Sequence, residues 1–375
     1  MKKLILFSYT LLAFLNSLKS QDIYDSVYFK NRWRTFMTHL PSGYSPDSKY
    51  PLVLCFHGGQ NGATQSQLGW RAIAYMSKLN QKSDSAKFIL VYPEGTVINN
   101  IRTWNAGACC PPAMNYNIDD VGFTNNMLDS LFEKYSIDTT RVYAAGSSNG
   151  AMLCFRLACE LSNRIAAIAT ISATQAFFPC NPLRKMPIIN IHSKVDDAVP
   201  YNGGVGVGPS GVNFISQDST MKIWKYINQC VINDTIVNGR DTNYTHIRIH
   251  NGICNTEFHQ FATSDGGHSW PGGNPNNNPV SYQINATDLL WSFFQHYRLD
   301  CGADYFFDGN GNWNDLSNWQ DSMLPPANLT GKSRIFINPK NGQSILNSTQ
   351  TINAGSELII KTGRNLWVPG RIDIQ

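Results

Sequence analysis

The first sign of chemistry in this sequence is a serine that lies between two glycines. Gly146, Ser148 and Gly150 form a G-x-S-x-G motif that follows the apolar run at residues 142–145 and precedes a helical pattern. This order of strand, turn and helix is the context of a nucleophile elbow, a tight turn that holds a serine hydroxyl above a sheet. Side chains at either glycine would collide with the neighbouring strand and helix. Ser148 is therefore the predicted nucleophile, and its neighbour Ser147 lies one residue too early.

A serine nucleophile needs a general base and a carboxylate, and in this arrangement both follow the serine along the chain. His268 lies in the Gly-rich stretch DGGHSWPGG, and Asp196 and Asp197 follow the apolar run at residues 187–191. The histidine would take the proton from the serine and return it to the leaving group, while the carboxylate orients the imidazole. His268 is the predicted base. Spacing alone leaves both Asp196 and Asp197 open as the acid.

The same chemistry needs two backbone N–H groups that face the developing oxyanion. The apolar run at residues 51–56 leads directly into His57-Gly58-Gly59-Gln60. The residue after the nucleophile, Asn149, would supply one N–H group. Gly59 is the candidate for the other, with Gln60 next. On its own the HGG turn could be an ordinary strand end, but ahead of an elbow it indicates an oxyanion hole.

Strand-like and helix-like stretches alternate between residues 34 and 298, which predicts a mostly parallel sheet with helices on both faces. Short apolar runs without alternation are typical of strands that are covered on both sides. The expected strands are 51–56, 87–92, 142–145, 166–171 and 187–191, and the expected helices are 119–135, 149–161 and 286–297. Asp119 or Asp120 would cap the first of these helices. The predicted fold class is α/β, with an α/β-hydrolase fold at residues 21–300.

After Cys301 the sequence becomes turn-rich and then alternates in short β-like segments, such as 334–337 and 357–361. We therefore expect a domain boundary near residue 300 and a β-rich accessory module at 301–375. No internal repeat is obvious, and the pattern stops part-way at Gln375, which suggests an incomplete module. The spacing of Trp313 and Trp319 could form a binding face, but packing in a core or turn is the expected role.

The first 20 residues have the pattern of a secretory signal peptide. Lys2 and Lys3 precede an apolar run at residues 4–15, and small and polar residues follow. About a dozen apolar residues is fewer than the roughly 20 that a membrane-spanning helix needs. We expect export, cleavage near Gln21 and no membrane span.

The charge balance does not favour nucleic-acid binding. The formal net charge is +4, and loss of the three lysines in residues 1–20 would lower it to about +1. Charged residues make up only 15% of the chain, and asparagine, glycine and aromatic residues are plentiful. This composition suits an extracellular protein that meets uncharged or polymeric substrates.

The sequence has nine cysteines, all after residue 20, and disulfides persist in exported proteins. Because nine is odd, at least one cysteine stays free or pairs between chains. The favoured disulfide is Cys230–Cys254, whose flanks resemble a helix end and a strand start. Cys55 lies inside an apolar run and is expected to be buried. A second, weaker prediction pairs Cys109 or Cys110 with Cys159 or Cys180.

Metal and cofactor sites are not indicated. No C-x-x-C pair occurs, and the adjacent Cys109 and Cys110 do not have the spacing of zinc ligands. His246 and His250 lie on a strand-like stretch, but no third ligand follows at a plausible spacing. We therefore expect neither a metal ion nor a cofactor.

Taken together, these motifs resemble the secreted polyhydroxybutyrate depolymerase and feruloyl esterase family of α/β-hydrolases. The matching stretches run in the family's order over about residues 35–298: LCFHGG, VYPEGT, TWNAGACC, IDDVGF, RVYAAGSSNGAM, IHSKVDDAVPY and DGGHSWPGG. The resemblance implies that Asp196 is the acid and His268 the base. It also implies that TWNAGACC and DDVGF shape the site, which makes Trp104 and Trp270 candidate substrate contacts, with packing as the alternative role.

The resemblance and the residues together predict an extracellular carboxylic-ester hydrolase that forms an acyl-enzyme on Ser148. Feruloyl or acetyl esters of plant polysaccharide are the expected substrates, and polyhydroxyalkanoate is the alternative. Ser147, the single glycine after Asn149, and the Gly-Pro-rich segment 203–211 depart from the family pattern and leave substrate preference open. The C-terminal module could attach to polymer or to the cell surface. A remote alternative is a surface binding protein without catalysis.

Overall fold

The computed structural model describes residues 19–61, 69–208, 210–236, 244–275, 277–302, 304–320, 323–329 and 332–375. The predicted signal peptide, except for its last two residues, lies outside these ranges. The chain divides into two compact units. The first extends to Gly252 and includes Thr256–Leu290, and the second comprises Ile253–Asn255 and Trp291–Gln375.

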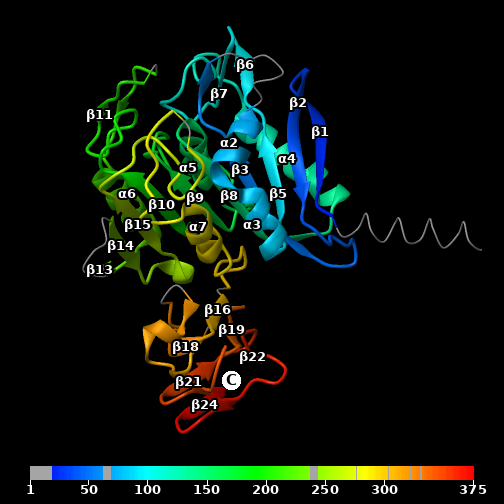
Figure 1. Cartoon of the computed structure of the whole chain (residues 1–375), viewed down its shortest axis with the longest axis vertical. Helices are drawn as coiled ribbons and strands as arrows, with labels where there is room; N and C mark the ends of the chain where they lie inside the picture. Colours follow the sequence, from blue (N-terminus) through cyan, green and yellow to red (C-terminus); the bar gives the residue numbers. More distant parts are fainter. Residues whose placement is uncertain are drawn as a thin grey trace, which may run out of the picture. The chain divides into compact units, whose positions relative to one another are not determined.

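A ten-stranded sheet forms the centre of the first unit (Figure 1). Its six inner strands are all parallel, and an antiparallel hairpin extends it at each edge. In spatial order the strands are β1 (Gln21–Phe29), β2 (Arg32–Leu40), β5 (Ile89–Pro93), β3 (Tyr50–Phe56), β8 (Ile137–Ser147), β9 (Ala167–Ile171), β10 (Ile188–Ser193), β15 (Phe258–Thr263), β14 (Tyr244–His250) and β13 (Ile232–Ile236). The predicted mostly parallel sheet is confirmed.

Helices cover both faces of this sheet. Strands β3, β9 and β10 are therefore buried at every position. The helices are α2 (Gly69–Ser77), α3 (Leu79–Ala86), α4 (Asp120–Lys134), α5 (Asn149–Glu160), α6 (Gln217–Asn228) and α7 (Ala286–Phe294). The Asp119 side chain accepts a hydrogen bond from the Gly122 backbone N–H at 2.8 Å, so Asp119 and not Asp120 is the N-cap of α4.

Short strands form two small sheets beyond the central one. One contains β4 (Gln60–Asn61), β7 (Ile101–Thr103) and β6 (Thr96–Ile98), and the other is the pair β11 (Gly204–Val205) and β12 (Asn213–Phe214). The pair β11 and β12 encloses most of the Gly-Pro-rich segment. Residues from both small sheets line the cavity described in the next section.

The second unit is built from parallel strands that repeat in threes. Its sheets are β16 (Asp304–Phe307), β19 (Arg334–Ile337) and β22 (Glu357–Ile360); β17 (Gly311–Asn312), β20 (Ser344–Ile345) and β23 (Leu366–Trp367); and β18 (Asn328–Leu329), β21 (Thr349–Ile352) and β24 (Arg371–Ile374). Each sheet takes one strand from each of three successive coils, as in a β-solenoid. Ile345 pairs with Trp367 and Gln350 with Ile372, an offset of 22 residues, and Arg334 pairs with Glu357, an offset of 23, so the last two coils repeat every 22 or 23 residues. This repeat is not apparent in the sequence, because the positions of the strands recur but the residue identities do not.

The two tryptophans of this unit pack inside it. Trp313 and Trp319 are each 3% exposed, and their rings meet edge to face with centroids 5.2 Å apart. Trp319 Nε1 donates a hydrogen bond to the Trp313 carbonyl at 2.7 Å. The expected packing role is therefore confirmed.

The cysteine pairing differs from the prediction. The disulfides are Cys109–Cys110, Cys159–Cys180 and Cys254–Cys301, while Cys55, Cys154 and Cys230 are free and buried. The predicted Cys230–Cys254 bond is wrong, because Cys254 belongs to the second unit and meets Cys301 there. Cys230 Sγ instead contacts the Thr256 carbonyl oxygen at 3.5 Å. The weaker prediction is also wrong, because Cys109 bonds to Cys110 and Cys159 bonds to Cys180.

Candidate active site

The turn between β8 and α5 has the geometry of a nucleophile elbow. Strand β8 ends at Ser147, helix α5 begins at Asn149, and Ser148 lies between them with φ 55° and ψ −127°. Such a conformation costs a non-glycine residue about 1–3 kcal/mol and persists only where the surroundings impose it. The Ser148 backbone N–H donates to the Ile171 carbonyl on the adjacent strand at 2.9 Å, which fixes the turn to the sheet.

The two glycines of the motif are required by close packing, as the sequence predicts. A Cβ atom at Gly146 would lie 2.6 Å from the Gly150 carbonyl carbon. A Cβ atom at Gly150 would lie 2.4 Å from the carbonyl oxygens of both Phe56 and His57. The elbow therefore lies directly against the end of β3, and the start of α5 can approach that strand only without a side chain.

Gly150→Ala should destabilise the protein by about 3 kcal/mol, because backbone oxygens of two residues would have to move. The melting temperature checks this, with Gly59→Ala as the matched control. The nearest atom to a Cβ at Gly59 is Thr103 Cγ2 at 3.5 Å, which is an ordinary contact, so the control should melt like the parent. Equal melting temperatures for the two variants would contradict the packing argument.

The predicted base contacts one of the two candidate acids. His268 Nδ1 lies 2.8 Å from Asp196 Oδ2, and the Asp196 side chain is fully buried. Asp196 Oδ1 accepts hydrogen bonds from the backbone N–H groups of Ala198 at 3.0 Å and Val199 at 2.9 Å. Asp197 is exposed. The contact with His268 distinguishes Asp196 from its neighbour, which spacing could not do.

A second histidine, His192, which the sequence indicated only as a structural residue, supports the same carboxylate. His192 Nε2 lies 3.3 Å from Asp196 Oδ2 and 2.8 Å from the Val199 carbonyl oxygen, so this nitrogen is a donor. The Gln217 side-chain amide donates to His192 Nδ1 at 2.7 Å, so this nitrogen is the acceptor of the ring. The only available signal was the position of His192 at a strand end, four residues before Asp196. Gln217, the first residue of α6, carried no signal.

Burial by itself would raise the pKa of Asp196. The hydrogen bonds from His192 and His268 outweigh burial and hold this pKa well below its usual range. The carboxylate therefore stays ionised at neutral and mildly acidic pH. In that form it can orient His268 and stabilise an imidazolium that forms there.

A cavity of about 420 Å³ collects most of the predicted site residues. Ser148, His268, Gly59 and Asn149 all line it, together with Gln60, Asn99, Ile101, Thr103, Cys110, Pro111, Pro112, Met152, Ala198, Val199, Gly208, Ser210 and Phe214. Small-molecule sites usually have volumes of about 300–1,000 Å³. The predicted nucleophile, base and both candidate oxyanion donors therefore face one space large enough for a bound ester.

The HGG turn lies against the nucleophile and is fixed by its histidine. A Cβ atom at Gly58 would lie 3.2 Å from Ser148 Cβ. His57 Nδ1 donates to the Gly58 carbonyl at 2.7 Å, and His57 Nε2 accepts from the Gly95 N–H at 3.0 Å. Burial lowers the pKa of His57 to about 3, so it stays neutral and keeps this tautomer. His57 thus holds the loop that carries Gly59.

Trp104 and Trp270 were candidate substrate contacts, and that prediction is wrong for both. They are 0% and 1% exposed, and neither lines the cavity. The backbone of Trp104 is bonded on both sides to the Asn149 side chain, with N–H to Oδ1 at 2.7 Å and Nδ2 to O at 3.0 Å. Trp270 Nε1 donates to Thr287 Oγ1 at 2.9 Å. Large aromatic rings next to an active site are needed here for packing.

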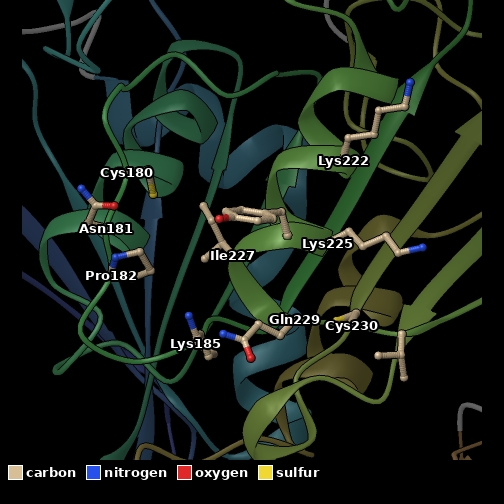
Figure 2. A pocket seen from close by; sticks show the side chains of 11 residues that line it. Cys180, Asn181, Pro182, Lys185, Lys222, Lys225, Ile227, Gln229 and Cys230 are labelled. Atoms are coloured by element: carbon tan, nitrogen blue, oxygen red, sulfur yellow. The ribbon is translucent and has the colours of Figure 1, made fainter.

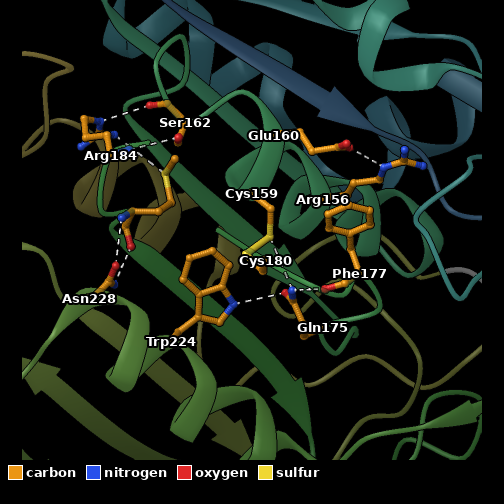
Figure 3. The surroundings of a disulfide bond; sticks show 11 residues. Arg156, Cys159, Glu160, Ser162, Gln175, Phe177, Cys180, Arg184, Trp224 and Asn228 are labelled. Carbon is orange, nitrogen blue, oxygen red and sulfur yellow. Dashed lines mark hydrogen bonds and ion pairs between the residues drawn. A yellow bond between two sulfur atoms is a disulfide. The ribbon is translucent and has the colours of Figure 1, made fainter. Parts of the chain in front are cut away.

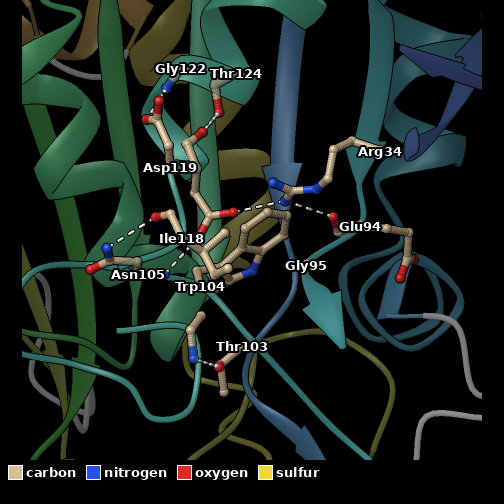
Figure 4. Close-up of polar contacts among 12 residues, drawn as sticks. Arg34, Glu94, Gly95, Thr103, Trp104, Asn105, Ile118, Asp119, Gly122 and Thr124 are labelled. Atoms are coloured by element: carbon tan, nitrogen blue, oxygen red, sulfur yellow. Dashed lines mark hydrogen bonds and ion pairs between the residues drawn. The ribbon is translucent and has the colours of Figure 1, made fainter. Parts of the chain in front are cut away.

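The stretch around Trp104 shapes the site through a buried polar cluster (Figure 4). Asp120 accepts hydrogen bonds from the Asn105 backbone N–H and from Arg34, each at 2.7 Å. Asp120 lies at the start of α4 in the IDDVGF stretch, and the segment it anchors continues to Cys110, which lines the cavity. The two stretches that the family resemblance singled out are thus bound to each other beside the nucleophile.

Within the described ranges, no three His, Cys, Asp or Glu side chains form a group that could hold a metal ion. Likewise, none of the described helices has the length and apolar character to cross a bilayer.

Comparison with known proteins places relatives of this chain among esterases. A family model described as a putative esterase matches residues 26–224. Feruloyl esterase B of Piromyces equi is 30% identical over 204 residues, which cover 52% of this chain and 36% of that protein. A bifunctional acetylxylan esterase/xylanase of Neocallimastix patriciarum is 29% identical over 170 residues, or 45% of this chain and 22% of that protein. A poly(3-hydroxyalkanoate) depolymerase of Paucimonas lemoignei is 28% identical over 138 residues, or 36% and 30%.

The match thus spans about a third of the length of the first relative and about a fifth of the second. Among solved structures, an acetyl xylan esterase from Aspergillus awamori superposes with a TM-score of 0.50 at 14% identity, covering 72% of this chain and 98% of that one. At 14% identity, this similarity shows only that the two proteins share a fold. The predicted α/β-hydrolase fold and the predicted family resemblance are confirmed.

Proposed function

The chain belongs to the putative esterase family, and from that premise we propose that it is a serine carboxylesterase using Ser148, His268 and Asp196. One observation carries the proposal. A strained serine and a histidine line the same cavity, and a buried, ionised aspartate holds that histidine from behind. The conformation of Ser148 between β8 and α5 is the one that a nucleophile elbow requires.

In the proposed reaction Ser148 Oγ attacks the ester carbonyl carbon while His268 Nε2 takes its proton. The carbonyl oxygen becomes an oxyanion that accepts hydrogen bonds from the backbone N–H groups of Gly59 and Asn149. When the intermediate collapses, the bond to the alcohol breaks, and His268 gives its proton to the leaving alkoxide. An acyl group is then left on Ser148 Oγ. Water that gives a proton to His268 then attacks the acyl carbon, the bond from that carbon to Ser148 Oγ breaks, and His268 returns the proton to Ser148 Oγ as the carboxylic acid leaves.

We propose feruloyl or acetyl esters of plant polysaccharide as the substrates. Two of the relatives are named for these activities, at 30% and 29% identity. The cavity supports an acyl group that enters a pocket, because its lining combines apolar side chains such as Met152 and Phe214 with polar ones such as Gln60 and Thr103. A cavity of about 420 Å³ is much larger than an acetyl group needs, which favours an aromatic acyl group such as ferulate.

We further propose an extracellular location, with residues 1–20 as a cleaved signal peptide. Three disulfides support it, because such bonds persist in oxidising compartments. In this proposal residues 301–375 are an accessory module that attaches the enzyme to polymer or to the cell surface.

The test is hydrolysis by the full chain of methyl ferulate, acetylated xylan, a short aryl ester and a polyhydroxybutyrate film. We expect kcat/KM on methyl ferulate to exceed the value on the aryl acetate by at least tenfold, with no soluble product from the film. Degradation of the film with little activity on the other esters would instead assign a polyhydroxyalkanoate depolymerase. Inactivity on every ester would leave a binding protein that has only kept the fold.

A further inference from the structure

A groove in the first unit lies apart from the catalytic cavity and shares none of its lining residues (Figure 2). Its volume is about 770 Å³, and it lies between the segment 180–185 and the C-terminal half of α6. Three lysines and a tyrosine give it its chemistry: Lys185, Lys222, Lys225 and Tyr226. Nothing in the proposed ester hydrolysis uses these residues.

Both walls of the groove are held by several bonds, so the groove is present before any ligand arrives. The Cys159–Cys180 disulfide ties one wall to helix α5 (Figure 3). The Asn228 side chain at the end of α6 bonds both backbone groups of Met186, at 2.9 and 2.7 Å. Arg184 donates to the carbonyl oxygens of Ile165 and Ala166, at 2.8 and 2.6 Å. A site that is already formed avoids the cost of ordering its walls upon binding.

The charge of the groove has one sign. No aspartate or glutamate is among its lining residues, all of which lie in the described part of the chain. Across the described ranges, none of the ion pairs involves Lys185, Lys222 or Lys225. Lys225 Nζ donates to the neutral Asn233 Oδ1 at 2.9 Å, which leaves its charge uncompensated. Three lysines without an ion pair among the described residues line one groove, and this excess of positive charge favours an anionic ligand.

Tyr226 adds a flat apolar surface among these charges. Tyr226 follows Lys225 on α6, is 85% exposed and is one of the residues that line the groove. Isolated exposed aromatics are unremarkable, but one set inside a cationic groove offers a face for stacking as well as charge. A ligand that matches both features bears carboxylates and has rings with an apolar C–H face, as pyranose sugars do.

We propose that this groove binds carboxylate-bearing stretches of polysaccharide, the uronic-acid units of plant cell-wall chains. The lysines would contact the sugar carboxylates, and the Tyr226 ring would lie against a sugar ring. This proposal rests on the proposed function, because it identifies the polymer to which the cleaved ester is attached. It adds a binding site to the catalytic unit itself, separate from the C-terminal module.

The distance between the groove and the catalytic cavity determines which substrates the groove can influence. Phe214, which lines the catalytic cavity, precedes the N-terminus of α6, whereas Lys225, Tyr226 and Gln229 lie at its other end. A helix of twelve residues is about 18 Å long, so a small ester cannot reach both places. The groove should therefore increase affinity for an acidic polymer and leave the hydrolysis of small esters unchanged.

The experiment measures binding of the full chain to polysaccharide by affinity electrophoresis. The gels contain de-esterified glucuronoxylan or the same polymer after carboxyl reduction. The variants are Lys222→Gln/Lys225→Gln and Tyr226→Ala. Lys49→Gln/Lys87→Gln, two exposed lysines elsewhere in the unit, is a control with the same change in net charge. Each groove variant should weaken binding to the acidic polymer about five- to tenfold. Parent and control should bind it alike, and kcat/KM on a short aryl ester should stay within twofold in all of them.

Equal binding by parent and groove variants would overturn the proposal, and so would equal binding to the carboxyl-reduced polymer. Duplex DNA that competes as well as the acidic polymer, with no loss in Tyr226→Ala, would show a general polyanion site instead. Because the polymer carries no ester, binding can be lost while small esters are still hydrolysed, and this result would reject only the groove. Binding that needs the groove, without hydrolysis of any ester, would reject only the proposed function.

Discussion

Replacing Ser148 with alanine should lower kcat for ester hydrolysis by about five to six orders of magnitude, because no acyl-enzyme could form. The oxyanion donors and the cavity would remain, so a small rate above that in water should persist. The measurement is the initial rate on a short aryl ester, with the melting temperature recorded in parallel. The melting temperature of the variant should equal or exceed that of the parent, because loss of the Ser148 hydroxyl removes no packing contact that the fold needs.

Ser147→Ala is the matched control, because Ser147 is the neighbouring serine and the last residue of β8. It should retain kcat within about threefold. A large loss in Ser147→Ala together with an active Ser148→Ala protein would reject the assignment of the nucleophile.

Replacing Asp196 with asparagine should lower kcat by about four orders of magnitude, while KM changes little. An amide can donate to His268 Nδ1, which favours the tautomer in which Nε2 carries the proton and cannot act as base. The Asp196 carboxylate also accepts from His192 and from two backbone N–H groups, so the loop should hold its shape in the variant.

Asp197→Asn removes the same charge one residue later, from an exposed side chain. Its kcat should stay within about twofold of the parent. If the two variants lost activity equally, the effect would come from the charge of the loop and not from orientation of His268.

The sequence predicted well those features that depend on local chemistry. Buried parallel strands need unbroken apolar runs, so β3, β8, β9 and β10 were recognised directly. The elbow was recognised because the backbone on both sides of Ser148 packs closely against other backbone atoms. Only glycine fits at Gly146 and Gly150. Asp196, chosen over Asp197 by family resemblance, is the aspartate that contacts His268.

Features that depend on contacts between distant segments could not be predicted. Cys254 pairs with Cys301 because its turn belongs to the second unit, and no sequence pattern marks that membership. Trp104 has the residue type of a substrate contact, but its backbone is bound to Asn149 and its ring is buried. The support of Asp196 by His192 depends on Gln217 in a helix that the apolar pattern did not reveal.

The central claim is that Ser148 is the residue that becomes acylated. Its most direct test is to label the full chain with a fluorophosphonate, which reacts with activated serines, and to locate the adduct by peptide mass spectrometry. We predict one adduct per chain, on Ser148, which Ser148→Ala abolishes and His268→Ala slows by several orders of magnitude. An adduct on Ser147 or on any other residue, or no adduct on a chain that hydrolyses esters, would contradict the account.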